Sequence, residues 1–241
     1  MHRLAVELLE PIFRLACVDG GYTGCSLSLV SHLVRSRSRT WRFHSISLVS
    51  GTAQQLAKFL RCFQKERAIA QSTGSDRLPT LRHLCISAAE GEEVRGEWRR
   101  YHTRDKQYDG SWEATVELER ECYIADLTEL IQLVGADLRT LSLVHSQGRP
   151  KLTRLPAIRC TGFPVLEELT ITNPDPFIPD PGADCLLPFY PRLARLHLLL
   201  ADGLCDEILR WADDGRAPHI THLRLSNLGE VSDDLKALVG M

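Results

Sequence analysis

A short apolar pattern returns along the chain at a nearly constant interval, and this repetition restricts the possible folds more than any other feature. The pattern is an apolar residue, any two residues, a second apolar residue, any one residue and a third apolar residue. Five copies begin at Leu81, Leu138, Leu166, Leu193 and Ile220. The last four follow one another at a nearly constant step of about 27 residues, which is the behaviour of an internal repeat. Single copies arise easily by chance in a leucine-rich chain, but three nearly equal intervals in succession do not.

The interval between the first two copies, from Leu81 to Leu138, is close to two periods. It therefore contains either an unidentified copy or an insertion. A further candidate copy, Phe43–Ile46–Leu48, precedes Leu81 by somewhat more than one period.

Each copy has the spacing of a β-strand that buries one face. Alternate side chains of a strand point to the same side, so the second and third apolar residues of each copy share one core. Each fully buried leucine or isoleucine stabilises the fold by about 1.5–3 kcal/mol. The copies are therefore predicted to stack as parallel strands. Their apolar triplets are Leu81–Leu84–Ile86, Leu138–Leu141–Leu143, Leu166–Leu169–Ile171, Leu193–Leu196–Leu198 and Ile220–Leu223–Leu225.

Several segments between the copies have apolar residues at helical spacing. We expect helices over Thr52 to Ala70, Glu121 to Val134 and Asp202 to Asp213, with a last helix starting at Ser232. The segment Asn173 to Phe189 contains five prolines and is predicted to be an irregular loop. Alternating strands and helices around a constant period predict a right-handed α/β solenoid.

These features resemble the leucine-rich repeat family, whose repeat length of about 20–29 residues includes the period found here. The resemblance covers residues 41–241 and is degenerate. The family places Asn or Cys three residues after the last apolar position, whereas the first two copies have Ala89 and Ser146 there. The resemblance implies stacked parallel strands with helices outside them, and a concave strand surface that binds a protein.

The first forty residues predict a separate helical motif. Leu4, Leu8 and Ile12 line one side of a first helix, and Phe13 lies on an adjacent side. A glycine-rich turn follows, and Leu27, Val30 and Val34 then share one side of a second helix. Two helices of this length cannot hold a core alone and must pack on something else.

This region resembles an F-box, with Leu4, Glu7, Leu8, Leu9, Ile12, Phe13, Cys25, Leu27, Val30 and Ser31 at matching positions. Ala5 replaces the usual proline, Pro11 falls inside the first helix, and Val34 stands where tryptophan is common. The arrangement is especially similar to divergent F-box-like proteins of mushroom-forming fungi, in which a leucine-rich repeat array follows.

The resemblance implies a substrate-recognition subunit of a cullin–RING (SCF-type) ubiquitin ligase. Its partners would be a Skp-family adaptor and a protein substrate whose identity the sequence does not indicate. The adaptor contacts carried over are Leu4, Leu8, Ile12, Phe13, Leu27 and Val30. The alternative is a leucine-rich repeat binding scaffold without a ligase link, in which these residues only cap the first repeat.

A charged insertion at about 90–121 carries Trp98, Tyr101, Tyr108 and Trp112. Large aromatic side chains are typical of binding hot spots, so these four are candidate partner contacts. The alternative is that these four side chains pack against the rest of the protein as part of an extra hairpin or helix. The arginine run at 35–42 is interpreted as a solvated helix end rather than a nucleic-acid site.

Other classes of function lack support in the sequence. The chain has no nucleotide-binding, hydrolase or zinc-protease motif, so we expect no enzyme activity, catalytic residues, metal or cofactor. A net charge of −2 gives no electrostatic reason to expect nucleic acid or membrane binding. Eight cysteines without paired or zinc-ligand spacing predict free thiols in a reducing compartment, cytoplasmic or nuclear.

Overall fold

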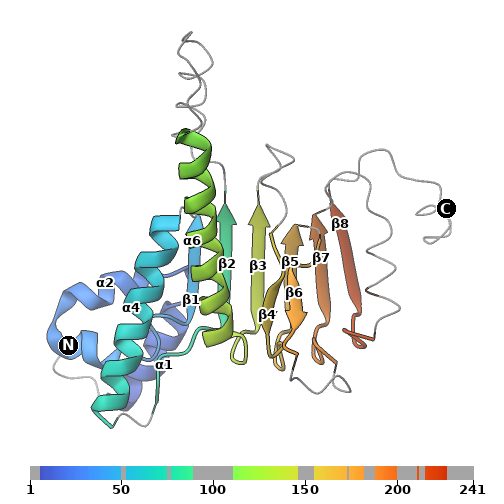
Figure 1. Ribbon diagram of the computed structural model, residues 1–241. Coiled ribbons are helices and arrows are strands. Elements are labelled where there is room, and N and C mark those ends of the chain that lie inside the picture. The colour runs from blue at the N-terminus through green and yellow to red at the C-terminus, as the bar shows by residue number, and fades with distance from the viewer. Residues whose placement is uncertain are drawn as a thin grey trace, which may run out of the picture.

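The computed structural model describes residues 6–49, 53–74, 77–88, 111–145, 155–172, 174–181, 188–199, 211 and 215–226. Within them the fold is mixed α/β around a six-stranded parallel sheet (Figure 1). The strands are β1 (Ser45–Val49), β2 (His83–Ala88), β3 (Thr140–His145), β5 (Glu168–Thr172), β7 (Arg195–Leu199) and β8 (His222–Ser226), side by side in that order.

The repeated apolar pattern sets the register of this sheet. Leu84 pairs with Leu141, Leu141 with Leu169, and Leu169 with Leu196. Ile46 of the candidate first copy pairs with Leu84 in the same way. The predicted parallel strands are therefore confirmed, including the one at residues 43–48.

A repeated backbone contact joins each copy to the next. One carbonyl before each strand accepts hydrogen bonds from two consecutive backbone N–H groups of the following copy. For example, the His44 carbonyl accepts from Arg82 and His83, both at 3.0 Å. The other accepting carbonyls belong to Arg82, Arg139, Glu167 and Ala194. The same junction at five successive steps explains why a constant spacing of the apolar triplets produces one continuous sheet.

Helices and a small second sheet cover one side of the six strands (Figure 1). Helix α4 (Ala53–Ser72) follows β1 and helix α6 (Ser111–Val134) follows β2. Farther along, strands β4 (Ile158–Cys160) and β6 (Phe177–Pro179) pair in parallel. The Gln132 side chain on α6 donates a hydrogen bond to the Arg159 carbonyl of β4, so helix and small sheet adjoin.

The core lies between this cover and the sheet. Leu81, Leu138, Leu166 and Leu193, the first residues of four copies, are fully buried, whereas Ile220 of the last copy is half-buried. Aromatic residues pack together in the part of the core near β6: Phe163 packs edge-on against Phe177 and is stacked on Tyr190.

Two sequence predictions need correction. Helix α6 begins at Ser111, earlier than expected, so its first part belongs to the predicted insertion. The predicted loop 173–189 contains the strand β6. This strand pairs with β4, and its first residue, Phe177, is buried in the core. The sequence left open whether the long interval between the first two copies holds an insertion or a further copy. Because β2 pairs directly with β3, this interval adds no strand between them. The helices expected at 202–213 and after Ser232 fall almost wholly outside the described residues.

The N-terminal motif forms three helices, α1 (Val6–Ala16), α2 (Tyr22–Val30) and α3 (His32–Arg37). Pro11 lies within α1 without ending it. The predicted second helix is divided at Ser31, whose extended backbone ends α2 and whose hydroxyl accepts a hydrogen bond from the Val34 N–H to start α3. Val34 is buried and Val30 exposed, so the predicted shared face of Leu27, Val30 and Val34 is wrong.

Candidate protein-interaction site

Helices α1, α2 and α3, here called the N-terminal module, rest against the free edge of β1. The Ser47 N–H donates a hydrogen bond of 3.0 Å to the Gly20 carbonyl, in the place where a further strand would pair. Gly20 has a positive φ of 75°, and a Cβ there would lie 2.9 Å from the Ser47 Cβ. At Gly24 a Cβ would overlap the Arg42 carbonyl oxygen. The module thereby covers an edge that would otherwise be open to pairing with another chain.

An ion-pair cluster joins the end of the module to α4. The Glu66 carboxylate lies 3.2 Å from the guanidinium groups of Arg35 and Arg39 and 3.0 Å from that of Arg42. Burial acts to raise the pKa of Glu66, but the charge of Arg42, the hydrogen bond from Arg35 and the charge of Arg39 outweigh it and hold the pKa below its usual value. The arginine run is therefore not simply a solvated helix end: Arg42 is buried, and three guanidiniums of the run surround one carboxylate.

The outer side of the N-terminal module is apolar. Leu8, Ile12 and Leu15 are spaced three and four residues apart, so they share one face of α1. Leu8 is 54% exposed and Ile12 48% exposed. Exposed apolar side chains continue through the rest of the module. Together we call these residues the apolar module surface: Leu8, Ile12, Leu15, Val18, Tyr22, Leu29, Val30 and Leu33.

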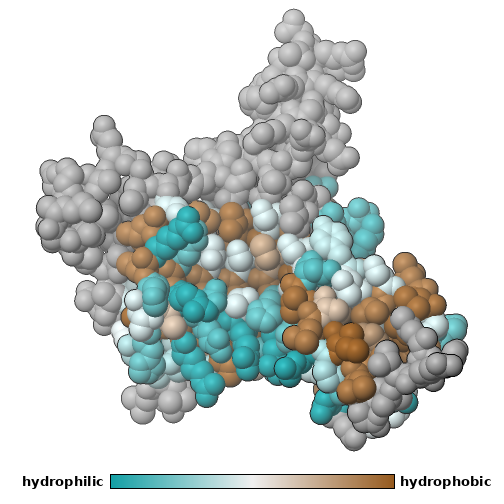
Figure 2. Space-filling model, turned by 180° about the vertical axis from the view of Figure 1, so that it is seen from behind, coloured by the Kyte–Doolittle hydropathy of each residue, from teal (hydrophilic) through white to brown (hydrophobic). Residues whose placement is uncertain are grey.

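Figure 2 shows hydrophobic residues gathered over this end of the molecule, at the right of the view. Single exposed leucines are ordinary on protein surfaces, whereas a concentration of them is typical of an interaction site. Outside the module, Leu118 and Leu223 are the large apolar side chains exposed to a similar degree in the described part of the chain. The exposed apolar residues thus concentrate on the three N-terminal helices.

The adaptor contacts implied by the F-box resemblance differ in how exposed they are in the structure. Leu8, Ile12 and Val30 are exposed, and Leu27 is half-buried. Phe13 is only 5% exposed, because it faces inward together with Cys17 and Val34. Phe13 therefore belongs to the interior of the module, and we leave it out of the contact surface. Leu4 lies outside the described residues.

The four aromatic residues of the charged insertion stay predicted partner contacts, because the described residues do not include their side chains. Trp98, Tyr101 and Tyr108 lie outside the described residues. Trp112 is in the first turn of α6, but the position of its side chain is outside the description.

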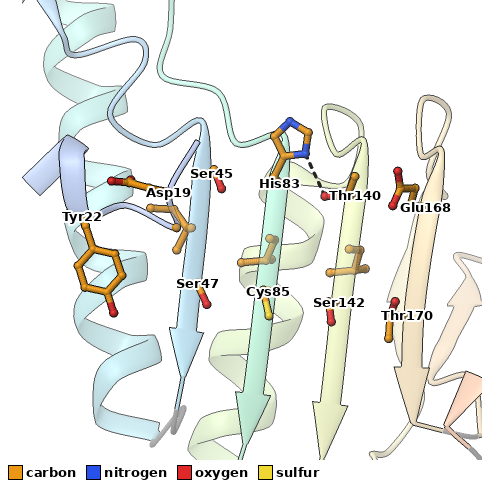
Figure 3. A pocket seen from close by; sticks show the side chains of 14 residues that line it. Asp19, Tyr22, Ser45, Ser47, His83, Cys85, Thr140, Ser142, Glu168 and Thr170 are labelled. Carbon is orange, nitrogen blue, oxygen red and sulfur yellow. Dashed lines mark hydrogen bonds between the residues drawn. The ribbon is translucent and has the colours of Figure 1, made fainter. Parts of the chain in front are cut away.

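A groove of about 480 Å³ crosses the uncovered side of the sheet, opposite α4 and α6 (Figure 3). It runs from the Asp19–Tyr22 turn of the N-terminal module over β1, β2, β3 and β5. Its side chains are those at alternate strand positions, facing away from the core. They are Ser45, Ser47, His83, Cys85, Thr140, Ser142, Glu168 and Thr170.

One hydrogen bond and one ion pair fix side chains of the upper row of the groove, which consists of Ser45, His83, Thr140 and Glu168. The His83 ring nitrogen Nδ1 is 3.0 Å from the Thr140 hydroxyl oxygen (Figure 3). Glu168 forms an ion pair with Arg195 on β7. Burial, together with the nearby positive charges of Arg139 and Arg82, lowers the pKa of His83, so its imidazole is neutral at pH 7.

His44 precedes β1 and contacts His83 of this row. Its ring packs edge-on against His83 at a centroid distance of 5.2 Å and against Trp41 at 5.8 Å. Burial, with His83 and the neighbouring arginines, lowers the pKa of His44 to about 4. His44 is therefore an uncharged packing group at neutral pH.

The sequence carries a signal for this groove in addition to the apolar triplets themselves. Each triplet has one variable position between its second and third apolar residues. In the first four strands those positions are Ser47, Cys85, Ser142 and Thr170. Because they alternate with core residues, they must face the opposite side of the sheet. All four side chains are small, so they leave space above the sheet and deepen the groove.

Comparison of the chain with protein-family models, with curated proteins and with solved structures found no match. Among the described residues, no helix has the length and apolar character needed to cross a membrane. The same part of the chain contains no group of three or more His, Cys, Asp or Glu side chains placed to hold a metal ion.

Proposed function

We propose that the chain is a substrate-recognition subunit of a cullin–RING ubiquitin ligase. In this proposal the N-terminal module docks a Skp-family adaptor through the apolar module surface. The residues from β1 onward form a degenerate leucine-rich repeat solenoid that holds the target protein. The single observation that carries the proposal is the exposure of Leu8 and Ile12 on one face of α1, within a module whose other side is packed.

Two features support a docking role for that face. First, the module has its own inward residues, Phe13, Cys17 and Val34, so its outward leucines are not needed for its packing. Second, apolar surface gains about 25 cal/mol for each Å² removed from water, so covering several leucines with a partner is favourable. Leu8, Ile12 and Val30 are residues that the F-box resemblance assigns to the adaptor.

The solenoid part of the proposal is supported by the repeated junction between strands. Successive copies are joined by the same two hydrogen bonds to one carbonyl, and their leucines pair in register. Repeats that contact only their neighbours are the organising feature of solenoid proteins.

A binding scaffold without a ligase link is the second candidate, and the contacts at Gly20 and Gly24 favour it. These glycines let the module approach β1 and cap the first strand. A capping role explains why the inward side of the module is packed against β1. It does not explain why leucines are exposed on the outward side.

The test is co-expression with a Skp-family adaptor followed by size-exclusion chromatography. A variant with Leu8→Asp and Ile12→Asp is compared with the wild type and with Leu118→Asp, which changes an equally exposed leucine on α6. We expect the wild type and Leu118→Asp to elute with the adaptor and the double variant to elute alone. Circular dichroism should show all three folded, since the substituted side chains are exposed.

Two results would contradict the proposal. One is that the wild type fails to co-elute with adaptors of the family. The other is that the double variant unfolds, which would mean that Leu8 and Ile12 belong to the core and that the module is only a cap.

A further inference from the structure

A row of small polar side chains runs straight across four strands. Ser47 pairs with Cys85, Cys85 with Ser142, and Ser142 with Thr170, so the four lie at the same level of the sheet. Figure 3 shows them in line on the uncovered side. The next residues at this level are His197 on β7 and Arg224 on β8. We call these six residues the cross-strand row.

The hydroxyls of this row match the groups of a peptide backbone. Serine and threonine hydroxyls both donate and accept hydrogen bonds, so they pair with amide N–H and carbonyl groups alike. Ser47, Ser142 and Thr170 are half-buried, which leaves their hydroxyls open to a ligand on the groove side. The apolar residues between them point into the core and do not compete for this space.

The row has an acidic end at the N-terminal module. Asp19 lines the groove, and its carboxylate accepts hydrogen bonds from the Thr23 N–H at 2.9 Å and the Thr23 hydroxyl at 2.6 Å. The hydroxyl hydrogen bond lowers the pKa of Asp19, so the carboxylate is ionised and held in place. Tyr22 is 76% exposed beside it. A fixed carboxylate next to an open aromatic ring suits a lysine or arginine side chain.

The opposite end of the row is basic. Arg224 is exposed, and no ion pair joins it to another of the described residues. It acts with burial to lower the pKa of His197, which is therefore neutral and hydrogen-bonded to Ser226 at 2.9 Å. Between the two ends, Glu168 and Arg195 neutralise each other. Among the described residues, the charges of the row and its N-terminal end that lie in no ion pair are thus Asp19 at one end and Arg224 at the other.

The length of the row sets the length of its occupant. Neighbouring strands are about 4.8 Å apart, so the five steps from Ser47 to Arg224 span roughly 24 Å. An extended peptide advances about 3.3 Å per residue and covers that distance in about seven residues.

We infer that the cross-strand row binds an extended polar segment of a target protein, about seven residues long. The segment places a basic side chain against Asp19 and Tyr22 and an acidic side chain against Arg224. The inference rests on the proposed function in one respect: it identifies what the target presents to the sheet. Two features disfavour nucleic acid. Asp19 repels phosphate, and Tyr22 is the single Phe, Tyr or Trp side chain among the described residues that line the groove, too few rings to stack successive bases.

The experiment is selection of phage-displayed random nine-residue peptides on the immobilised full-length chain. We expect enriched sequences to carry Lys or Arg about six or seven positions from Asp or Glu. Enriched peptides are then synthesised, and their binding is measured by fluorescence anisotropy. Ser142→Trp, which fills the middle of the row, should weaken binding at least tenfold. Gln54→Trp, on the exposed side of α4, should leave it unchanged.

Charge reversal tests the predicted orientation. Asp19→Lys should weaken binding of the selected peptides at least tenfold, and replacing their basic residue by Glu should restore much of it. Cys85 offers a direct readout of position, since it lies within the row and is partly accessible. Bound peptide should slow its alkylation by N-ethylmaleimide without slowing that of the exposed Cys122 on α6.

Several outcomes would overturn the inference. These are enriched sequences without the charge pair, equal affinity for folded Ser142→Trp and wild type, or no rescue of Asp19→Lys by the acidic peptide. Should Ser142→Trp fail to fold, the charge-reversal and alkylation results decide alone. The Leu8→Asp, Ile12→Asp variant should bind peptide as the wild type does. If the wild type binds the selected peptides but no adaptor, the proposed function is contradicted and this inference stands. If it binds the adaptor but no peptide of the expected kind, this inference is contradicted and the proposed function stands.

Discussion

The carboxylate of Glu66 and the guanidinium of Arg42 form an ion pair of 3.0 Å in which both side chains are buried, with 5% and 7% of their surface exposed. Arg42 precedes the first strand and Glu66 lies in the middle of the first long helix. A buried charge is tolerated only when it is paired, so this contact fixes how the N-terminal region approaches α4. Arg35 and Arg39 complete the cluster.

Removing the carboxylate should destabilise the protein strongly. Glu66→Gln leaves three guanidinium groups without their anion, and breaking a buried ion pair costs about 3–5 kcal/mol. We expect the free energy of unfolding, measured by urea titration, to fall by about that amount. Glu121→Gln changes an exposed glutamate on α6 and should stay within about 0.5 kcal/mol of wild type. Equal effects of the two substitutions would show that the cluster contributes little.

Stability should decrease as the pH falls from 6.5 toward 4. The pKa of His44 is lowered from 6.5 to about 4 in the folded state, so in this range the unfolded chain binds a proton that the folded chain does not. Such a group destabilises the fold on acidification, by about 2–3 kcal/mol between pH 7 and 4.5 for this shift. Glu66, whose pKa is also lowered, adds a loss of stability at still lower pH.

The variant His44→Phe tests this assignment because it keeps an aromatic ring and removes the titration. Urea titrations at pH 7 and 4.5 should show a smaller difference in unfolding free energy for the variant than for wild type. A difference of the same size would assign the acid sensitivity to other groups.

The contact between α2 and the segment before β1 should not tolerate a methyl group. In Gly24→Ala the new Cβ would overlap the Arg42 carbonyl oxygen, a backbone atom that cannot turn aside. We expect a loss of roughly 1–3 kcal/mol, the usual cost of overpacking. Thermal unfolding should show it. Ser26→Ala, an exposed change on the same helix, is the control and should shift the midpoint little. A Gly24→Ala protein as stable as wild type would mean that α2 does not rest on this carbonyl.

Arg216 should be essential to the C-terminal strands. It forms a 3.1 Å ion pair with the buried Asp175 and donates a 2.7 Å hydrogen bond to the Phe177 carbonyl. Its guanidinium also lies 5.0 Å from the Phe189 ring centroid. Arg216→Met removes these polar contacts, including the ion pair with Asp175, while keeping an unbranched apolar chain.

Because repeats contact mainly their neighbours, the effect of Arg216→Met should be local. Hydrogen exchange at the amides of β7 and β8 should accelerate by at least tenfold, whereas the amides of β1 and β2 should keep their protection. Uniform acceleration along all six strands would show that the sheet unfolds as one unit.

The strands could be predicted because their signal is local and repeated. Leu84, Leu141, Leu169 and Leu196 recur with the spacing of one buried face, and the sheet pairs them as the repeat predicts. The N-terminal leucines were singled out as a surface for a partner, and Leu8 and Ile12 are exposed. Phe13 was assigned to the same surface, but a helical pattern does not say which side of a short helix faces its neighbours.

What the sequence determined by itself is the strands of the six-stranded sheet and their order, since alternation and a constant period depend only on residues close in the chain. The tertiary structure decided three things that depend on residues far apart. Glu66 gathered three arginines, because a buried carboxylate needs cations wherever the fold supplies them. Residues of the insertion became the start of α6, which packs on the core only farther along, from Tyr123 onward. The cross-strand row arose because parallel register places one variable residue of each copy at the same level.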